Sequence, residues 1–332
     1  MTESKEKILV ALSGGVDSAV AAMSLLKAGH EIETVYVKTW DHEDDLLGEC
    51  PGAKDLEDAR AVADKLKIPF RILNLMDFYH HHVVDPMIQG YAQGITPNPD
   101  VLCNREMKFG ALLDYALSEN FDALATGHYC RRVVTDDGKV QLWEGLDKNK
   151  DQSYFLSRIT PEQLFRARFP LGEMDKVKVR SLAKKYDLPV ADKKDSQGIC
   201  FLGKVKVPEF LSNFIEDQPG EIITVEGKIV GKHKGLHRYT LGQRRGIGVP
   251  SNTDHENFVV TGKDQSSNRL IVAFENTHET TLWGQSYEIS DLSFLEKLDL
   301  STPLSLLAKP RYRDPSTSIL LESKESGSAK IT

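Results

Sequence analysis

The chain has 332 residues, of which 40% are hydrophobic and 27% charged, and its formal net charge is -7 at pH 7. This length suits two or three modules with buried cores. The negative net charge excludes a protein whose whole surface is basic and binds nucleic acid. No apolar run approaches the roughly 20 residues of a membrane-spanning helix, and residues 1–7 are too short for a leader peptide, so we expect a cytoplasmic protein without membrane contact.

The first part of the chain alternates strand and helix signals. Strands are predicted near residues 8–12, 32–38 and 70–75, and helices near 18–28 and 54–66. This order predicts a parallel sheet with helices on both faces, and ligands of such sheets bind at the carboxyl ends of the strands.

The loop Ser13-Gly14-Gly15-Val16-Asp17-Ser18 follows the first predicted strand. Two glycines allow the backbone to approach a ligand, and the amides at a helix N-terminus attract an anion. Asp17 can hold a magnesium ion shared with phosphates. The loop therefore favours a nucleotide site over a plain serine-capped turn, although it lacks the Lys-Ser/Thr of a Walker A sequence. It resembles the PP-loop of ATP pyrophosphatases, which implies AMP and pyrophosphate as products.

Further elements are predicted along the rest of the chain. Helices are expected at 78–95, 108–118 and 161–186, and residues 123–128 are expected to form a buried strand that ends at the same pocket. After residue 220, short strands alternate with glycines. The segments 258–261, 269–273 and 304–309 indicate a small barrel.

Cys103 lies in the segment Thr96-Pro-Asn-Pro-Asp-Val-Leu-Cys-Asn104. Two prolines should keep this segment out of a helix, so we expect Asp100 and Cys103 on a rigid loop before a helix that begins near Lys108. A cysteine near a helix N-terminus can be a nucleophilic thiolate, and Asp100 could move a proton. Taken alone, a structural cysteine is the stronger interpretation.

Cys200 follows a basic run, and positive neighbours favour its thiolate. Two loops over one pocket could bring Cys103 and Cys200 together, but two unrelated buried thiols remain an open alternative. The run His80-His81-His82 is expected to be a polar surface and not a metal site, on the ground that no cysteine or acidic ligand stands at a supporting spacing.

Basic residues concentrate in two segments, 176–206 and 228–245. A phosphate backbone could bind them, whereas charge runs of this kind are more often a solvated face.

Six motifs together resemble the tRNA-specific 2-thiouridylase (MnmA) family. They are residues 13–18, 96–104, 125–129, 145–155, 193–201 and 237–248, and the similarity runs in order from Ile8 to about Arg313. The resemblance implies a Rossmann-like α/β sheet with a PP-loop, a small mixed central domain and a C-terminal β-barrel. The expected boundaries are 1–207, 208–280 and 281–332. Since the chain ends at Thr332, short of the family's usual last strands, we expect the barrel to be incomplete.

The resemblance also implies ATP-dependent 2-thiolation of the wobble uridine in tRNAs for lysine, glutamate and glutamine. ATP and Mg2+ adenylate the uracil, and a persulfide replaces the activated oxygen. Cys200 resembles the persulfide carrier, and Cys103 the nucleophile that ends in a transient disulfide with Cys200. Release of free sulfide by Cys103 fits the same residues. Asp100 resembles the general acid/base, and the implied partners are tRNA and a protein persulfide donor.

Binding positions are carried over in the same way. Matches to the family's ATP contacts are Ala11, Leu12, Ser13, Gly14, Gly15, Val16, Asp17, Ser18, Val37 and Gly127. Matches to its tRNA contacts are Asn98, Pro99, Asp100, His128, Lys150, Asp151, Gln152, Arg311 and Tyr312. Val37 stands where the family usually has methionine. Two other readings are a different PP-loop adenylase, such as an amide-forming synthetase, and an RNA-binding protein whose loop is only structural.

Overall fold

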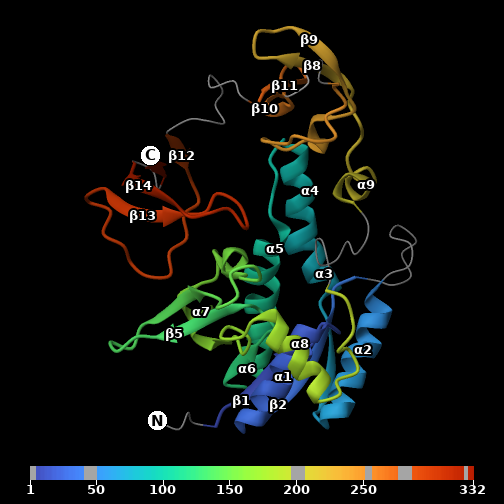
Figure 1. Ribbon diagram of the computed structural model, residues 1–332, viewed down its shortest axis with the longest axis vertical. Coiled ribbons are helices and arrows are strands. Elements are labelled where there is room, and N and C mark those ends of the chain that lie inside the picture. The colour runs from blue at the N-terminus through green and yellow to red at the C-terminus, as the bar shows by residue number, and fades with distance from the viewer. Residues whose placement is uncertain (1–4, 41–50, 196–205, 251–255, 276–285, 325–327) are drawn as a thin grey trace.

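The structure is a computed structural model that describes residues 5–40, 51–195, 206–250, 256–275, 286–324 and 328–332 (Figure 1). Among these residues, no helix combines the length and the apolar character that crossing a membrane requires. Cys50 and Cys200 lie outside the described residues, so the expected pairing of Cys103 with Cys200 is not seen here.

Five parallel strands form the sheet of the N-terminal part. They are β1 (Lys7–Ala11), β2 (Glu31–Lys38), β3 (Phe70–Asn74), β4 (Ala123–Ala125) and β7 (Ala167–Arg168). Their order is β3-β2-β1-β4-β7, so the predicted parallel sheet is confirmed. From β1 the chain adds β2 and β3 on one side of the sheet and then β4 and β7 on the other side, so the strand order reverses between β1 and β4. In open α/β sheets this switch point is where ligands bind, outside the carboxyl ends of the strands.

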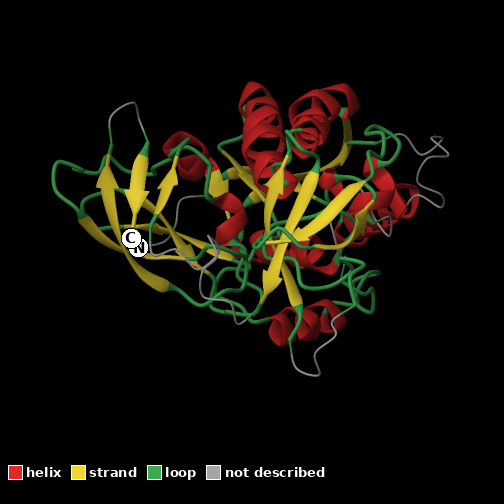
Figure 2. Ribbon diagram, turned by 90° about the horizontal axis from the view of Figure 1, so that it is seen from above, coloured by secondary structure: helices red, strands yellow, loops and turns green. Residues whose placement is uncertain are grey.

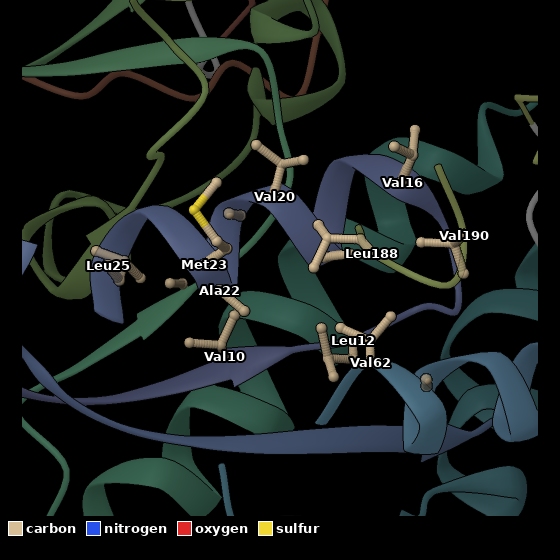
Figure 3. Close-up of a cluster of buried hydrophobic side chains, with 14 of the residues drawn as sticks. Val10, Leu12, Val16, Val20, Ala22, Met23, Leu25, Val62, Leu188 and Val190 are labelled. Atoms are coloured by element: carbon tan, nitrogen blue, oxygen red, sulfur yellow. The ribbon is translucent and has the colours of Figure 1, made fainter. Parts of the chain in front are cut away.

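Alternate residues of β1 pack on opposite faces of the sheet, as strand geometry requires. Ile8 and Val10 join a buried cluster with α1 (Val16–Ala28), α2 (Pro51–Leu66) and α8 (Lys176–Lys185). Leu9 joins a second cluster that contains Phe109 and Leu112. Helices therefore lie on both sides of the strands (Figure 2). Figure 3 shows part of the first cluster, in which Val10 and Leu12 lie below α1.

Two helical segments follow β3. The first runs through α3 (Met76–Tyr79), the π-helix η2 (His80–Val84) and α4 (Asp85–Ala92), which confirms the helix expected there. The second runs through α5 (Pro99–Leu102), the π-helix η3 (Cys103–Leu112) and α6 (Leu113–Ser118).

The prediction that Asp100 and Cys103 lie on a loop is wrong, because a helix already begins at Pro99. Proline is tolerated at the first helical position, where its missing N–H would have no partner anyway. The side-chain oxygen of Asn98 caps the helix by accepting hydrogen bonds from the backbone N–H groups of Asp100 and Val101. Cys103 consequently sits one turn into a helix.

The continuous helix predicted over 161–186 is also wrong. An unpredicted hairpin of β5 (Cys130–Val134) and β6 (Val140–Glu144) leads to η4 (Ser153–Leu156), and α7 (Pro161–Arg166) then ends where Ala167 becomes extended. Ala167 pairs with Leu124 of β4, so strand β7 separates α7 from α8. Burial of Ala167 at the sheet edge outweighs local helix propensity.

The remaining strands form two further sheets. After α9 (Val207–Leu211), one sheet has the order β10-β11-β8-β9, from β8 (Gly220–Thr224), β9 (Ile229–His233), β10 (Phe258–Asp264) and β11 (Arg269–Phe274). The other has the order β12-β15-β14-β13, from β12 (Tyr287–Ile289), β13 (Leu304–Ala308), β14 (Thr317–Ser323) and β15 (Ala329–Ile331). In Figure 1, α4 rises from the parallel sheet to the first of these, and the second lies to its left.

The grouping of 258–261 and 269–273 with 304–309 in one barrel is therefore wrong. Strand β11 pairs in parallel with β8, and its Leu270 and Val272 bury against Ile222 in a core of their own. A parallel partner 48 residues earlier leaves no local sequence signal.

Candidate functional site

The glycine loop between β1 and α1 is a tight turn braced by its own serine. The backbone N–H of Ser13 donates to Ser18 Oγ (3.1 Å), and Ser18 Oγ donates to the carbonyl of Gly15 (3.1 Å). Gly14 has φ +71°, and a Cβ there would lie 2.2 Å from the carbonyl oxygen of Asp55. Only glycine fits this position. The loop thus offers backbone groups to a ligand. The first N–H groups of α1 have no acceptor within their helix.

Gly127, just beyond β4, lies against the beginning of α1. A Cβ at Gly127 would be 2.8 Å from the backbone nitrogen of Ser18 and 2.9 Å from the carbonyl carbon of Asp17. The ends of β1 and β4 are therefore held together at the switch point of the sheet. A glycine cradle beside a helix N-terminus fits the phosphates of a nucleotide.

Asp17, the candidate magnesium ligand, is held by two side chains from distant parts of the chain. Lys176 Nζ lies 2.7 and 2.8 Å from its two carboxylate oxygens, and the hydroxyl of Tyr129 donates to it (2.7 Å). Burial and the adjacent Asp17 raise the pKa of Tyr129, so the phenol stays protonated. Since Lys176 contacts both oxygens, a cation bound by Asp17 must share that carboxylate with Lys176 or displace it.

Asp195 gathers three basic side chains beside this loop. It pairs with Lys150 (2.7 Å), Lys176 (2.8 Å) and Arg180 (2.5 Å). Burial alone would raise the pKa of Asp195, but hydrogen bonds from Lys150 and Lys176 hold that pKa well below its usual range. Three basic side chains from separate positions in the chain therefore meet at one carboxylate beside the glycine loop.

Lys193 ties the glycine loop to α2. Its ammonium donates to the carbonyl of Gly14 (3.0 Å) and pairs with Asp55 (2.6 Å) and Asp58 (2.5 Å). Burial lowers the pKa of Lys193, but the two carboxylates outweigh this effect and raise it. Part of the basic run 176–206 is thus internal to the site, while Lys178, Lys184, Lys185 and Lys194 are exposed.

Cys103 lies in a third buried cluster, where its side chain is packed with Tyr79, Met107 and Phe210. Val37, at the end of β2, packs against this cluster and also against the cluster on the sheet. Val37 therefore lies where the end of β2 meets the two clusters that contain residues of η3. Asp100, one turn earlier in that helix, is half-buried.

Four of the residues matched to tRNA contacts are engaged inside the protein. His128 is 8% exposed, and its Nδ1 lies 2.7 Å from the hydroxyl of Thr126. Burial, with a contribution from Lys108, holds the pKa of His128 well below its ordinary value. Asp151 accepts from the backbone of Gly145 (2.8 Å), Gln152 accepts from the N–H of Tyr129 (3.1 Å), and Lys150 pairs with Asp195. Their direct contact with tRNA stays a prediction.

Arg311 and Tyr312 connect the C-terminal sheet to the other two parts. Arg311 donates to the carbonyl of Leu241 (2.9 Å), and the Tyr312 ring lies 4.6 Å from that of Phe155. Nearby, the second basic run contributes Arg244 to the linings of two cavities of about 330 and 620 Å³.

Sequence reasoning did not assign Lys176, Lys193, Tyr129 or Asp195 to the site. Asp195 and Lys193 lie in the motif 193–201, where the sequence points to the cysteine. Lys176 and Lys193 also belong to the basic run 176–206, which by itself indicates only a solvated face. Asp175, which caps α8 by accepting from the N–H of Lys178, marks where Lys176 begins that helix. Nothing in the sequence relates Lys176 to Asp17, 159 residues earlier.

The fold and the loop define the class of protein: an α/β domain with a glycine loop at its switch point. The profile described as tRNA methyl transferase HUP domain matches residues 6–204, and the one described as tRNA methyl transferase PRC-barrel domain matches residues 208–274. The chain belongs to the tRNA-specific 2-thiouridylase family.

Individual relatives cover nearly the whole chain. The tRNA-specific 2-thiouridylase MnmA of Akkermansia muciniphila is 48% identical over 325 residues, which are 98% of this chain and 90% of that protein. The protein of the same name from Pseudomonas fluorescens strain Pf0-1 is 44% identical over 98% of this chain and 86% of its own length. Among solved structures, NMN synthetase from Francisella tularensis has a TM-score of 0.34 and 19% identity, over 61% of this chain and 69% of that one.

Proposed function

We propose that this protein is an ATP-dependent tRNA uridine 2-thiolase of the cytoplasm. It replaces the C2 oxygen of the wobble uridine, in tRNAs for lysine, glutamate and glutamine, by sulfur from a protein persulfide donor. The observation that supports this proposal most strongly is the 48% identity to a tRNA-specific 2-thiouridylase over 98% of the chain, together with a glycine loop at the switch point of the sheet.

ATP activates the base in the proposed reaction. The loop from Ser13 to Ser18, with Gly127, binds the phosphates, and Ala11, Leu12 and Val37 border the nucleotide at the strand ends. The uracil C2 oxygen attacks the α-phosphorus of ATP, pyrophosphate leaves, and the oxygen becomes part of an AMP leaving group. Asp17 would hold Mg2+, with Lys176 yielding or sharing the carboxylate, and the bound cation would neutralise charge on the phosphates.

Two cysteines then deliver the sulfur. The terminal sulfur of a Cys200 persulfide attacks C2, and AMP departs with the oxygen. The Cys103 thiolate attacks the Cys200 sulfur, which leaves sulfur on the base and a disulfide between the cysteines, and an external thiol reductant supplies the two electrons that restore both thiols. Asp100 accepts the N3 proton of the uracil when the C2 oxygen is adenylated and returns it to N3 when sulfur has replaced that oxygen. Cys130 takes no part, because burial, with a contribution from Asp151, raises its pKa well above the ordinary value and keeps it protonated.

The tRNA is proposed to bind across all three parts of the chain. Residues 1–207 form the adenylation domain, 208–280 a central tRNA-binding domain and 281–332 the C-terminal sheet. Asn98, Pro99 and Asp100 meet the flipped base, because a stacked base cannot reach a buried site. Arg311 and Tyr312 contact the tRNA body, while Lys150, Asp151, Gln152 and His128 shape the surface next to the loop.

The test is a single-turnover reaction with unmodified tRNA, ATP labelled on the α-phosphate and a persulfide donor. We expect 2-thiouridine and AMP in equal amounts. Formation of ADP, or of AMP without thiolation of the nucleoside, would contradict the proposal, the second outcome in favour of another adenylase.

Cysteine variants separate chemistry from folding. Cys103→Ser and Cys200→Ser should abolish 2-thiouridine while tRNA binding stays within about twofold of the unsubstituted protein, since neither thiol is needed for phosphate contacts. Cys130→Ser is the matched control, a buried cysteine that should keep thiolation if the variant folds. Loss of tRNA binding in both site variants would point to structural cysteines.

A further inference from the structure

We propose that His80, His81 and Asp85 form a site for a borderline divalent transition-metal cation of the Zn2+ type. The sequence predicts only a polar surface here, on the ground that no acidic ligand stands at a supporting spacing. The surface is polar, since His81 is exposed, but this ground is wrong, because the helix brings Asp85 to both imidazoles. His80 Nδ1 lies 3.2 Å from Asp85 Oδ1, and His81 Nδ1 lies 3.1 Å from Asp85 Oδ2.

The π-helix η2 explains why these three residues meet. Its wider turn places residues five apart one above the other, and the backbone N–H of Asp85 donates to the carbonyl of His80. Asp85 therefore faces His80, five residues earlier, and His81, four residues earlier. In a regular α-helix the first of these pairs would be turned apart.

The donor atoms are spaced for one small cation. All three ligand atoms lie within 4.8 Å of one another, and tetrahedral bonds of 2.0–2.2 Å place neighbouring donors about 3.3–3.6 Å apart. His81 is 71% exposed and His80 43%, so side-chain rotation can close the set and water can fill the fourth position. Two imidazoles with one carboxylate suit zinc, cobalt or nickel, whereas magnesium and calcium require oxygen ligands.

The helix that holds the donors is anchored on its other face. Tyr79, Val83 and Val84 are buried in the cluster that contains Cys103. The His80 ring also stacks on Trp40, with 6.4 Å between centroids and 27° between planes. The backbone of the site is thus fixed, so a cation has to order only side chains.

His82 provides a matched control on the same turn. Its Nδ1 lies 2.9 Å from the carbonyl of Phe78, and its ring stacks on the Phe78 ring at 3.9 Å. It is not among the three donors, so the structure separates His82 from His81 although the two are adjacent in the sequence.

The experiment is a titration of the full-length, tag-free and metal-free protein with Co2+, followed by visible absorption and calorimetry. We expect one equivalent with the weak visible bands of nitrogen and oxygen ligands. His81→Asn and Asp85→Asn should weaken this binding at least about tenfold, since even the outer partners of metal ligands contribute 10–100-fold. His82→Asn should leave it unchanged.

Folding and competing ligands are checked in the same samples. Each variant should keep the circular dichroism and melting temperature of the metal-free parent, and Co2+ should raise the melting temperature only where the donors are intact. Equal affinity and stoichiometry in the parent and both donor variants would overturn the proposal. So would a spectrum that consists only of intense sulfur-to-cobalt charge transfer, because the cysteines would then hold the metal.

Discussion

Lys176 Nζ is bonded to both carboxylate oxygens of Asp17, at 2.7 and 2.8 Å. The lysine begins α8 and the aspartate lies in the first turn of α1, so this pair joins the basic run to the glycine loop. A positive charge beside the candidate phosphate site is therefore balanced by the candidate magnesium ligand. We expect a nucleotide that enters the loop to rearrange this pair.

Replacing this lysine tests its part in nucleotide binding. Lys176→Met removes a charge-assisted bond of roughly 1.5–3 kcal/mol and leaves Asp17 as an uncompensated negative charge. We expect the KM for ATP to rise about ten- to a hundredfold and to depend more steeply on Mg2+. Lys178→Met, on the exposed side of the same helix, is the control. Equal KM values for the two variants in thiolation assays would contradict this role.

Replacing the two adjacent glycines of the loop by alanine should change the stability of the protein by very different amounts. Gly14→Ala meets a left-handed φ of +71° and a backbone oxygen at 2.2 Å. The left-handed backbone conformation costs about 1–2 kcal/mol of stability, and the steric clash costs about 1–3 kcal/mol. At Gly15 the nearest atom to a new Cβ is Ser13 Oγ at 3.4 Å, an ordinary contact. Urea unfolding should therefore show a large loss of stability for Gly14→Ala alone, and similar losses in both variants would rule out this account.

The Asn98 cap of α5 should affect the rate of thiolation more than its effect on stability explains. Asn98→Ala removes hydrogen bonds to the N–H groups of Asp100 and Val101, a loss of about 0.5–2 kcal/mol. Because Asp100 and Cys103 lie in the next two turns, we expect kcat for thiolation to fall more than the melting temperature explains. Thr160→Ala removes the capping box of α7 and is the control. A kcat loss of the same size in Thr160→Ala would refute positioning by Asn98.

Stability should depend on pH through His128. Burial holds its folded-state pKa well below the ordinary 6.5, so the unfolded chain takes up the proton first. The stabilisation is complete above pH 6.5 and is lost, by about 1.4 kcal/mol per pH unit, as the pH falls toward the folded-state pKa. The stability difference between the parent and His128→Gln should therefore shrink between about pH 7.5 and about pH 5.5. A constant difference in urea unfolding would contradict neutral burial.

Local patterns predicted the elements next to the site well. The apolar run 8–12 with the glycine loop after it became β1 and the turn before α1, because strand burial and glycine conformation are local properties. The same reasoning was wrong at Pro99, where proline begins a helix. Proline excludes the interior of a helix but favours its first position, and only the cap by Asn98 decides between the two.

By itself, the sequence determined the parallel sheet, the glycine loop and the membership in its family, since these follow from hydrophobic periodicity and from motifs of adjacent residues. The tertiary structure alone decided which charges meet at the loop. Asp17, Lys176 and Asp195 are separated by up to 178 residues, and their pairing depends on the reversal of strand order between β1 and β4. Coulomb interactions weaken with distance and are screened by salt beyond about 10 Å, so the partners of these charges are set by the packing of the helices and not by their spacing along the chain.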